Sequence, residues 1–452
     1  MMLNIRLSYS SAPYSLIRFR LPENLFSVFV RRMASALELW CLPSMALGNI
    51  LDVGYKTIIY SNTESKFLGN NDDRLSKFRY IICPSIVTQW LNFLTYVLLL
   101  VVYLMGGDQG HLTTFYFVIA ISGVVFGINM TLLYSVDFHY LPVYIVGENS
   151  FPALTSLIHY LATLTFGNRR KYNSDFLLVE IDIVVAIIIS FVAAMVWSIG
   201  YGYFAGQLSN PASPADTDLK HIYSFGFIAK FRPEQISPFL MIVVGMGLVY
   251  AIYPGIAPGM IVPFYLIDKI EMVLLIATIF PPVIVATLRR TASKTSIWSH
   301  YQSPMCKWGY DETTQEGSAW KWKNTGNTTD ESGANRASAS FDAFFWHAFD
   351  LLMVIKISLA AIFIYSLHYR ESNLSRSIIN QPKMSTFLSI VFYMCHECLL
   401  AIGFPGLVGA NGGGDYVLIP QYIGALFMIF LAFYSEGYII EYKSHDPAHW
   451  PK

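Results

Sequence analysis

Long runs of apolar residues constrain this chain more than any other feature of its sequence. A helix needs about 20 apolar residues to cross the roughly 30 Å hydrocarbon core of a bilayer. Ten runs of sufficient length are present, at residues 36–60, 80–105, 112–136, 141–166, 176–204, 238–259, 262–288, 343–366, 384–408 and 416–440. Backbone polar groups must be paired in lipid, and these runs lack the alternation of β-barrel strands, so each is predicted to be a helix. The sequence therefore predicts an all-α, polytopic bundle of 10–11 membrane spans.

The composition of the chain agrees with a membrane location. Only 13% of the residues are charged and 54% are hydrophobic, whereas soluble domains carry about 25% charged residues. There is too little charge to cover a water-facing surface, so the lipid bilayer is the expected partner. The formal net charge is zero, which does not indicate a nucleic-acid partner. The five cysteines are too scattered for a disulfide scaffold.

The spans divide the chain into five segments. Residues 1–35 form a basic tail, residues 36–288 hold the first seven spans, residues 289–342 are hydrophilic, residues 343–440 hold the last three spans, and residues 441–452 form a second tail. The hydrophilic segment is rich in Gly, Ser, Thr, Asn and charged residues without apolar periodicity, so it is predicted to be a disordered loop.

Several readings of the ends and of the orientation stay open. The basic tail is compatible with a transit peptide, with a cytoplasmic tail, or with a start at Met33. Lys and Arg residues outside the spans show no clear bias towards one side. An eleventh span between residues 106 and 140 would place the hydrophilic loop in the cytoplasm. Glycosylation motifs begin at Asn327 and Asn373.

Ionisable residues inside the spans are the candidate functional residues, because such groups are costly in lipid. They are Asp52, Lys56, Glu148, Asp268, Glu271, Asp350, Lys356, His396, Glu397 and Glu436, with His159 as a weaker candidate. Glu180 and Asp182 lie near the start of a span, where the interface is expected to keep them wet. Asp52 and Lys56 are four residues apart, so they either neutralise each other or line a pore. Glu148 lies among small residues and is expected to face a cavity.

Known enzyme and metal-site patterns do not fit the chain. It contains no zinc-protease motif, no nucleophile elbow and no P-loop. The cluster Cys395-His396-Glu397-Cys398 places neighbouring ligands on different sides of a helix, so helix packing is the favoured interpretation. We therefore expect no enzymatic activity, no metal and no cofactor.

Proline and glycine residues predict breaks in three spans. The segments are Tyr253–Gly259, Pro281-Pro282 and Phe404-Pro405-Gly406. A broken helix exposes backbone groups, which is tolerated beside a cavity or inside protein, and transporters use such breaks to bind solutes. Simple kinks near helix ends are the alternative.

Several segments, taken in order, resemble the equilibrative nucleoside transporter family. Leu42-Pro43, Asn49 and Asp52-Val53-Gly54-Tyr55 resemble its first helix, although Ser44 replaces a family tryptophan. Leu141-Pro142-Val143-Tyr144 and Gly147-Glu148 resemble the turn and start of its fifth helix, with Glu148 in place of a glutamine. Tyr253-Pro254-Gly255 resembles the end of its seventh helix, and the stretch from Phe264 to Asp268 resembles Phe-x-x-x-Asp of its eighth. The Gly-Arg that follows this aspartate in the family is absent.

The resemblance implies a two-bundle, transporter-like arrangement that moves a small polar solute, for instance a nucleoside, by alternating access. It implies that Asp268 and Glu148 line the solute cavity, with Asp52, Asn49 and Tyr253 as secondary contacts. The plasma membrane is the expected location, and an organelle membrane is the alternative. A second resemblance, to the Tpr-related family of multi-spanning proteins expanded in piroplasm parasites, has no diagnostic motif. The alternative function is a non-transporting member of such a surface or interaction family, in which the hydrophilic loop would be the active part.

Overall fold

The computed structural model contains α-helices, short π-helical segments and one 3-10 turn in the part of the chain that it describes. It describes residues 26–62, 77–105, 111–136, 141–167, 174–203, 236–250, 276–291, 346–411 and 418–444, with shorter pieces between 7 and 22 and between 252 and 274. No strand occurs among these residues. The predicted all-α class is therefore confirmed.

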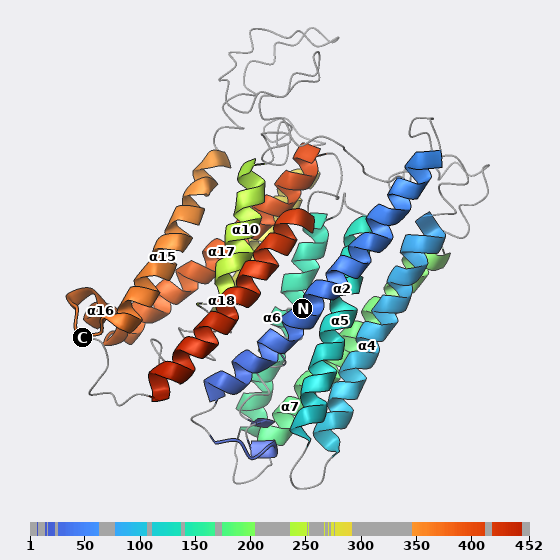
Figure 1. Ribbon diagram of the computed structural model, residues 1–452. Helices are drawn as coiled ribbons and strands as arrows, with labels where there is room; N and C mark the ends of the chain where they lie inside the picture. The colour runs from blue at the N-terminus through green and yellow to red at the C-terminus, as the bar shows by residue number, and fades with distance from the viewer. Residues whose placement is uncertain are drawn as a thin grey trace, which may run out of the picture. The chain divides into compact units, whose positions relative to one another are not determined.

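The helices follow the apolar runs of the sequence (Figure 1). They are α2 (Phe26–Asn62), η2 (Phe78–Ile82), α4 (Cys83–Leu104), α5 (Leu112–Val136), α6 (Leu141–Phe166), α7 (Ser174–Trp197), η4 (Ser198–Tyr203), α10 (Ile236–Tyr250), α13 (Phe280–Thr291), η8 (Trp346–Phe349), α15 (Asp350–His368), α16 (Asn373–Ile379), α17 (Pro382–Asn411) and α18 (Leu418–Ser444). The bounds of α5 and α6 match the predicted spans residue for residue, because an apolar run ends where a helix leaves the lipid.

Five helical stretches are long and apolar enough to cross a bilayer among the described residues. They are Phe78–Leu104, Leu112–Val136, Phe176–Gly202, His347–His368 and Pro382–Leu407. Large apolar side chains on these stretches are exposed, including Val196 of α7 (64%) and Leu351 of α15 (60%). Exposed apolar side chains along whole helices are expected where lipid replaces water as the solvent. The chain is thus an integral membrane protein.

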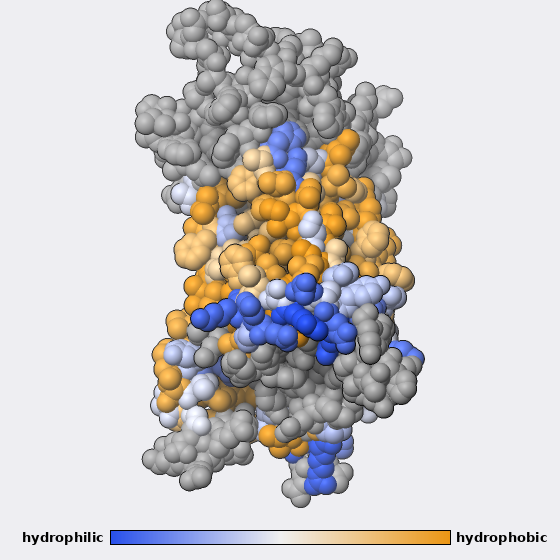
Figure 2. All heavy atoms as spheres, turned by 90° about the vertical axis from the view of Figure 1, so that its left-hand side faces the viewer, coloured by the Kyte–Doolittle hydropathy of each residue, from blue (hydrophilic) through white to orange (hydrophobic). Residues whose placement is uncertain are grey.

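Figure 2 shows this apolar surface on one face of the molecule, where apolar residues cover a continuous region with hydrophilic residues gathered along its edge. The connection from α15 through α16 to α17 carries exposed charged residues, among them Glu371, Arg376 and Lys383. Charged residues at the end of apolar helices are expected where the chain meets water or lipid headgroups.

The structure bears on four predictions about the ends and breaks of the spans. Residues 26–35 belong to α2 and not to a tail, so Met33 lies inside this helix. The described residues of the segment 106–140 form the single helix α5, which leaves too few residues for an eleventh span. Helix α17 runs through Pro405 without interruption. Residues 276–277 are helical, residues 278–279 form a turn, and Pro281 and Pro282 stand in the first turn of α13, so the helix is interrupted next to this pair as the sequence predicts.

Other predicted features lie partly or wholly outside the described residues. Only the two ends of the stretch 238–288 are fully described, as α10 and α13. The predicted break at 253–259 falls between them, and of that segment nothing is described. The hydrophilic loop is described only at its first three residues, which end α13. The second tail is described to Ser444, where α18 ends.

The helices form two compact units that are not continuous in sequence. The first unit comprises residues 1–139, 148–225 and 432–444, and the second comprises residues 140–147, 226–431 and 445–452. A division after the seventh span, as the sequence order suggests, therefore does not describe the packing.

In the first unit, α2 packs on α5, α5 on α4, and α4 on α7 (Figure 1). The closest approach is between α2 and α5, where Gly123 and Gly127 of α5 lie directly against the backbone of Leu37 and Cys41. Glycines four residues apart form one small-residue face of a helix, which lets two membrane helices touch through their backbones. This pair of glycines sets the distance between α2 and α5.

The N-terminal segment also belongs to the first unit. The guanidinium of Arg18 donates to the carbonyl of Met105 at 2.7 Å and to that of Tyr103 at 3.3 Å. The hydroxyls of Ser15 and Tyr103 are 2.7 Å apart. A cation at the last carbonyls of a helix satisfies acceptors that have no intrahelical donor. Part of the predicted basic tail thus caps the C-terminus of α4.

In the second unit, α10, α15 and α17 pack on one another, and α13 packs on α17. Gly424 of α18 lies against Met246 of α10. Helix α16 begins with Ser372 as its N-cap, whose hydroxyl oxygen accepts a hydrogen bond from the backbone N–H of Ser375 at 3.1 Å. The side chain of Ser375 is fully buried.

Candidate functional site

The structure describes three of the five residues that the sequence predicts to bind the solute. Asn49 and Asp52 lie on α2, and Glu148 lies on α6. Asp268 and Tyr253 lie outside the described residues. Their predicted roles stay predictions.

Asn49 and Asp52 belong to a row of polar side chains on one face of α2. Residues three apart share a helix face, and Ser35 and Glu38 form a similar pair nearer its start. The side chains of Glu38 and Asp52 are only 2% and 1% exposed. Glu38 Oε1 and Asn49 Oδ1 are buried and have no hydrogen-bond partner among the described residues. Glu38 is not among the candidate residues predicted from the sequence, although it lies three residues after Ser35 and therefore on the same polar face of the helix.

Glu148 is half-buried on α6 and interacts electrostatically with Tyr134 of α5. Pro152 follows one turn later inside the same helix. Proline has no N–H, so the carbonyl of Glu148 receives no hydrogen bond from the residue four positions on. The carboxyl group and this carbonyl together make the region around Glu148 rich in hydrogen-bond acceptors.

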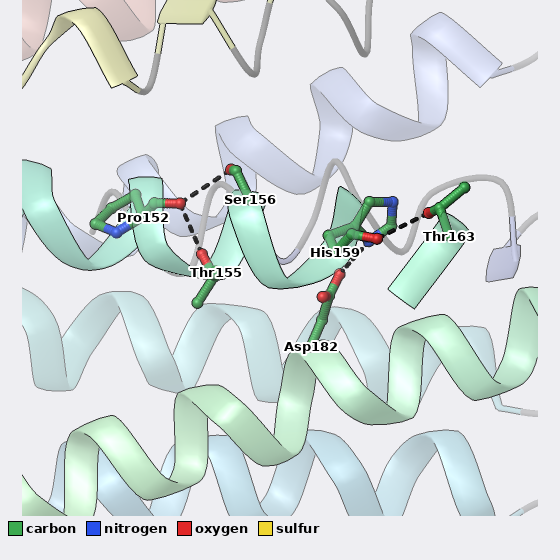
Figure 3. A network of polar contacts seen from close by, with 6 residues as sticks. All are labelled: Pro152, Thr155, Ser156, His159, Thr163 and Asp182. Carbon is green, nitrogen blue, oxygen red and sulfur yellow. Dashed lines mark hydrogen bonds and ion pairs between the residues drawn. The ribbon is translucent and has the colours of Figure 1, made fainter. Parts of the chain in front are cut away.

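The first unit contains a histidine–carboxylate pair that joins two helices (Figure 3). His159 Nδ1 on α6 lies 2.8 Å from Asp182 Oδ2 on α7. The side chain of Asp182 is 4% exposed and that of His159 is 23% exposed. The expectation that the interface keeps Asp182 wet is therefore wrong, because helix packing buries it. Asp182 Oδ1 is buried and lacks a hydrogen-bond partner within the described residues.

Hydroxyl groups line the same helix near this pair. Thr155 and Ser156 both donate to the carbonyl of Pro152, at 2.8 and 2.9 Å, and Thr163 donates to the carbonyl of His159 at 2.8 Å (Figure 3). Each hydroxyl is used inside α6, so none of these bonds connects α6 to a neighbour. The ion pair, not the hydroxyls, is what links α6 to α7 here.

The second unit contains a buried cation at the contact of three helices. Lys356 Nζ on α15 donates to the carbonyl of Gly245 on α10 at 2.5 Å, and His396 Nδ1 on α17 lies 2.7 Å from the same oxygen. Lys356 is 0% and His396 is 2% exposed. The ammonium lies 5.0 Å from the ring centre of Phe392, which adds a cation–π attraction.

The charge of Lys356 is not cancelled by a direct ion pair. No carboxylate of the described residues lies within 4 Å of its ammonium, although Glu397 is near enough to interact through space. His396 Nε2 lies 4.0 Å from Glu397 Oε1, which is itself 3% exposed. The cluster Cys395–Cys398 therefore supplies His396 and Glu397 to a polar contact with α10 and α15. The sequence predicts that Lys356 and His396 lie in spans, but it does not predict that they meet. Their shared hydrogen-bond acceptor is the backbone carbonyl of Gly245, and no side chain marks this position in the sequence.

A third polar cluster, also in the second unit, lies at the start of α15. Asp350 Oδ2 is 2.7 Å from His347 Nδ1, and Asp350 Oδ1 accepts a hydrogen bond from Ser237 Oγ at 2.5 Å. Both side chains of the ion pair are about one third exposed. Asp350 thus has partners for both oxygens at a partly solvated helix end, which is an ordinary structural role.

A metal centre is absent from the described residues. No group of three or more His, Cys, Asp or Glu side chains there has the geometry to hold a metal ion. The four cysteines at positions 41, 83, 395 and 398 are free thiols.

Comparison with known proteins adds no identification. No protein-family model matches the chain, and no curated protein is significantly similar to it.

Proposed function

We propose that this membrane protein moves a small polar solute, of which a nucleoside is the first candidate, across a lipid bilayer by alternating access. The observation that carries the proposal is the buried ammonium of Lys356. It lies within a spanning helix, is fully buried, and has a backbone carbonyl rather than a carboxylate as its hydrogen-bond acceptor. Ionisable groups at such positions are rare and mark solute or ion pathways.

A purely structural role for Lys356 is less consistent with the energetics. Burying an ammonium costs several kcal/mol, and an apolar residue of similar volume commonly gives equal or greater stability. Lys356, His396 and Glu397 meet at one three-helix contact, where a polar pathway would account for the cost of burying them. The acceptor-rich region at Glu148 and the polar face of α2 support the same proposal from the first unit. Asp268, Glu148, Asp52, Asn49 and Tyr253 remain the proposed solute contacts, to which we add Lys356 and His396.

The test is uptake of radiolabelled adenosine, inosine and uridine by cells that lack their own nucleoside transporters, with surface expression measured in parallel. We expect saturable uptake that unlabelled nucleosides compete away. Lys356→Met should reduce uptake at least tenfold, equivalent to losing about 1.4 kcal/mol of solute binding, while Lys383→Met, at an exposed position of α17, should leave it unchanged. Asp268→Asn should also reduce uptake without removing the protein from the membrane.

The outcomes separate the proposal from its alternative. No uptake from well-expressed protein would refute nucleoside transport and favour a non-transporting surface or interaction protein. Uptake that is equal in Lys356→Met and wild type would remove the buried cation from the mechanism. Deletion of residues 292–342 is a second discriminator, because a transporter should tolerate it and an interaction protein should not.

A further inference from the structure

His159 and Asp182 form a pair between α6 and α7 in which the carboxylate is buried and half satisfied while the imidazole is partly exposed. The two groups are 2.8 Å apart and join α6 to α7. One carboxylate oxygen of Asp182 has the imidazole as partner, and the other is buried without a hydrogen bond among the described residues. A buried polar atom left unmet costs free energy, so its retention calls for an explanation.

The charge state of this pair decides whether it is compatible with a low-dielectric surrounding. With one proton shared between imidazole and carboxylate, the pair is neutral overall. Without that proton it carries one negative charge, and with a second proton it carries one positive charge. A net charge at a buried position in a membrane protein is strongly unfavourable unless water reaches it. Losing or gaining a proton therefore favours a conformation in which the pair meets water.

The two members of the pair differ in exposure. Asp182 is the ninth residue of α7, so it lies about 12 Å along the axis from the start of that helix. The imidazole of His159 is 23% exposed, whereas the carboxylate of Asp182 is 4% exposed. The imidazole can thus exchange a proton with its surroundings and pass it to the carboxylate.

Few other charged groups of the described residues lie near His159 and Asp182. Helix α4, which packs against α7, carries no acidic, basic or histidine residue, and its ionisable side chains are Cys83, Tyr96 and Tyr103. Glu180 lies on α7 two residues before Asp182 and so points in a different direction. On α6, Tyr160 is exposed and Glu148 lies three turns away. In the N-terminal segment, Arg18 is bound to carbonyls at the end of α4.

We propose that His159 and Asp182 form a proton-binding pair that couples solute movement to the proton gradient. The ligand is a single proton, taken from water on one side of the membrane and released to water on the other side in each cycle. The proposal rests on the transport function proposed above and names the energy source of that function. It involves no oxidation and no covalent step.

The structure offers a matched control in the second unit. His347 and Asp350 have the same Nδ1–Oδ2 arrangement at 2.7 Å, but both are about one third exposed and Asp350 is fully hydrogen-bonded. Asp350→Asn changes the same type of pair without removing a buried, half-satisfied carboxylate. A general effect of breaking a histidine–aspartate pair would appear in both variants, and a specific effect only in Asp182→Asn.

The first experiment measures radiolabelled uridine in liposomes containing the purified full-length protein, with and without a gradient of one pH unit and with the membrane potential held at zero. One coupled proton shifts the steady-state uridine ratio by up to about tenfold, and its sign gives the direction of coupling. We expect wild type and Asp350→Asn to respond, and Asp182→Asn not to respond while still exchanging internal for external uridine. A full response of Asp182→Asn, or no response of an active wild type, would overturn the proposal.

The second experiment detects the proton without transport. Infrared difference spectra of the same protein, taken between acidic and neutral buffer, should contain a carboxylic-acid band that is absent in Asp182→Asn, shifted in His159→Gln and kept in Asp350→Asn. Circular dichroism checks that the variants are folded. If Asp182→Asn gives the wild-type spectrum, the pair is not the proton site. If no variant and no wild-type protein moves uridine, the transport proposal fails for this solute and the coupling fails with it, whereas the band still reports whether the pair binds a proton.

Discussion

Replacing Gly123 by alanine tests whether backbone contact holds α2 and α5 together. An alanine Cβ at this position would overlap the carbonyl oxygen of Leu37 and would lie 3.1 and 3.3 Å from its carbonyl carbon and Cα. All three atoms belong to the backbone, so no side-chain rotation can relieve the overlap. The two helices would have to separate by about 1 Å to restore ordinary contact distances.

The magnitude follows from the packing that is lost. Inserting a methyl group into a close-packed contact costs about 1–3 kcal/mol, and alanine recovers up to about 1 kcal/mol through its higher helix propensity. We expect Gly123→Ala to lower the free energy of unfolding by about 1–2 kcal/mol. Gly54 of α2 provides the control, because a Cβ there meets no atom within 4 Å. Gly54→Ala should therefore be neutral or stabilising.

The assay is unfolding of the purified protein in mixed micelles of increasing denaturing detergent, followed by circular dichroism. We expect Gly123→Ala to lower the detergent fraction at which half of the protein is unfolded. Gly54→Ala should raise this midpoint or leave it unchanged. A midpoint for Gly123→Ala at or above that of wild type would refute the backbone contact between α2 and α5. A large loss in Gly54→Ala would show that the result reflects glycine replacement in general.

Three further predictions follow from local contacts. Arg18→Gln should destabilise the first unit by about 1 kcal/mol by removing hydrogen bonds to the last carbonyls of α4, measured by the same unfolding assay, and an equal loss in the exposed Arg20→Gln would contradict the cap. Ser372→Ala should cost about 1 kcal/mol because α16 loses its N-cap, whereas Ser377→Ala, on the exposed side of that helix, should cost less; hydrogen exchange of α16 distinguishes them. Asn373 should carry no glycan in the folded protein, because Ser375 of its motif is buried inside α16; a glycosidase-sensitive gel shift that disappears in Asn373→Gln would refute this.

The sequence by itself determined that the chain is helical, that it belongs in a membrane, and where most helices begin and end. The reason is that span length and apolar content are local requirements of the bilayer, and α5 and α6 show how sharply the apolar runs mark these bounds. It also determined which residues are costly in lipid, since Lys356, His396, Asp52 and Glu148 were recognised from their positions alone. The start of α2 was missed because Arg31 and Arg32 interrupt the apolar run without ending the helix.

Only the tertiary structure decided which of these residues meet. Periodicity places a residue on a helix face, but it does not say which helix that face touches. The hydrogen bond from Lys356 to Gly245 spans 111 residues and ends on a backbone oxygen that has no signature in the sequence. His159 and Asp182 are 23 residues apart on different helices, and the aspartate is buried only because these helices are packed into the fold. The proposed proton pair and the buried cation are thus products of helix packing, because charge compensation in a membrane depends on neighbours in space.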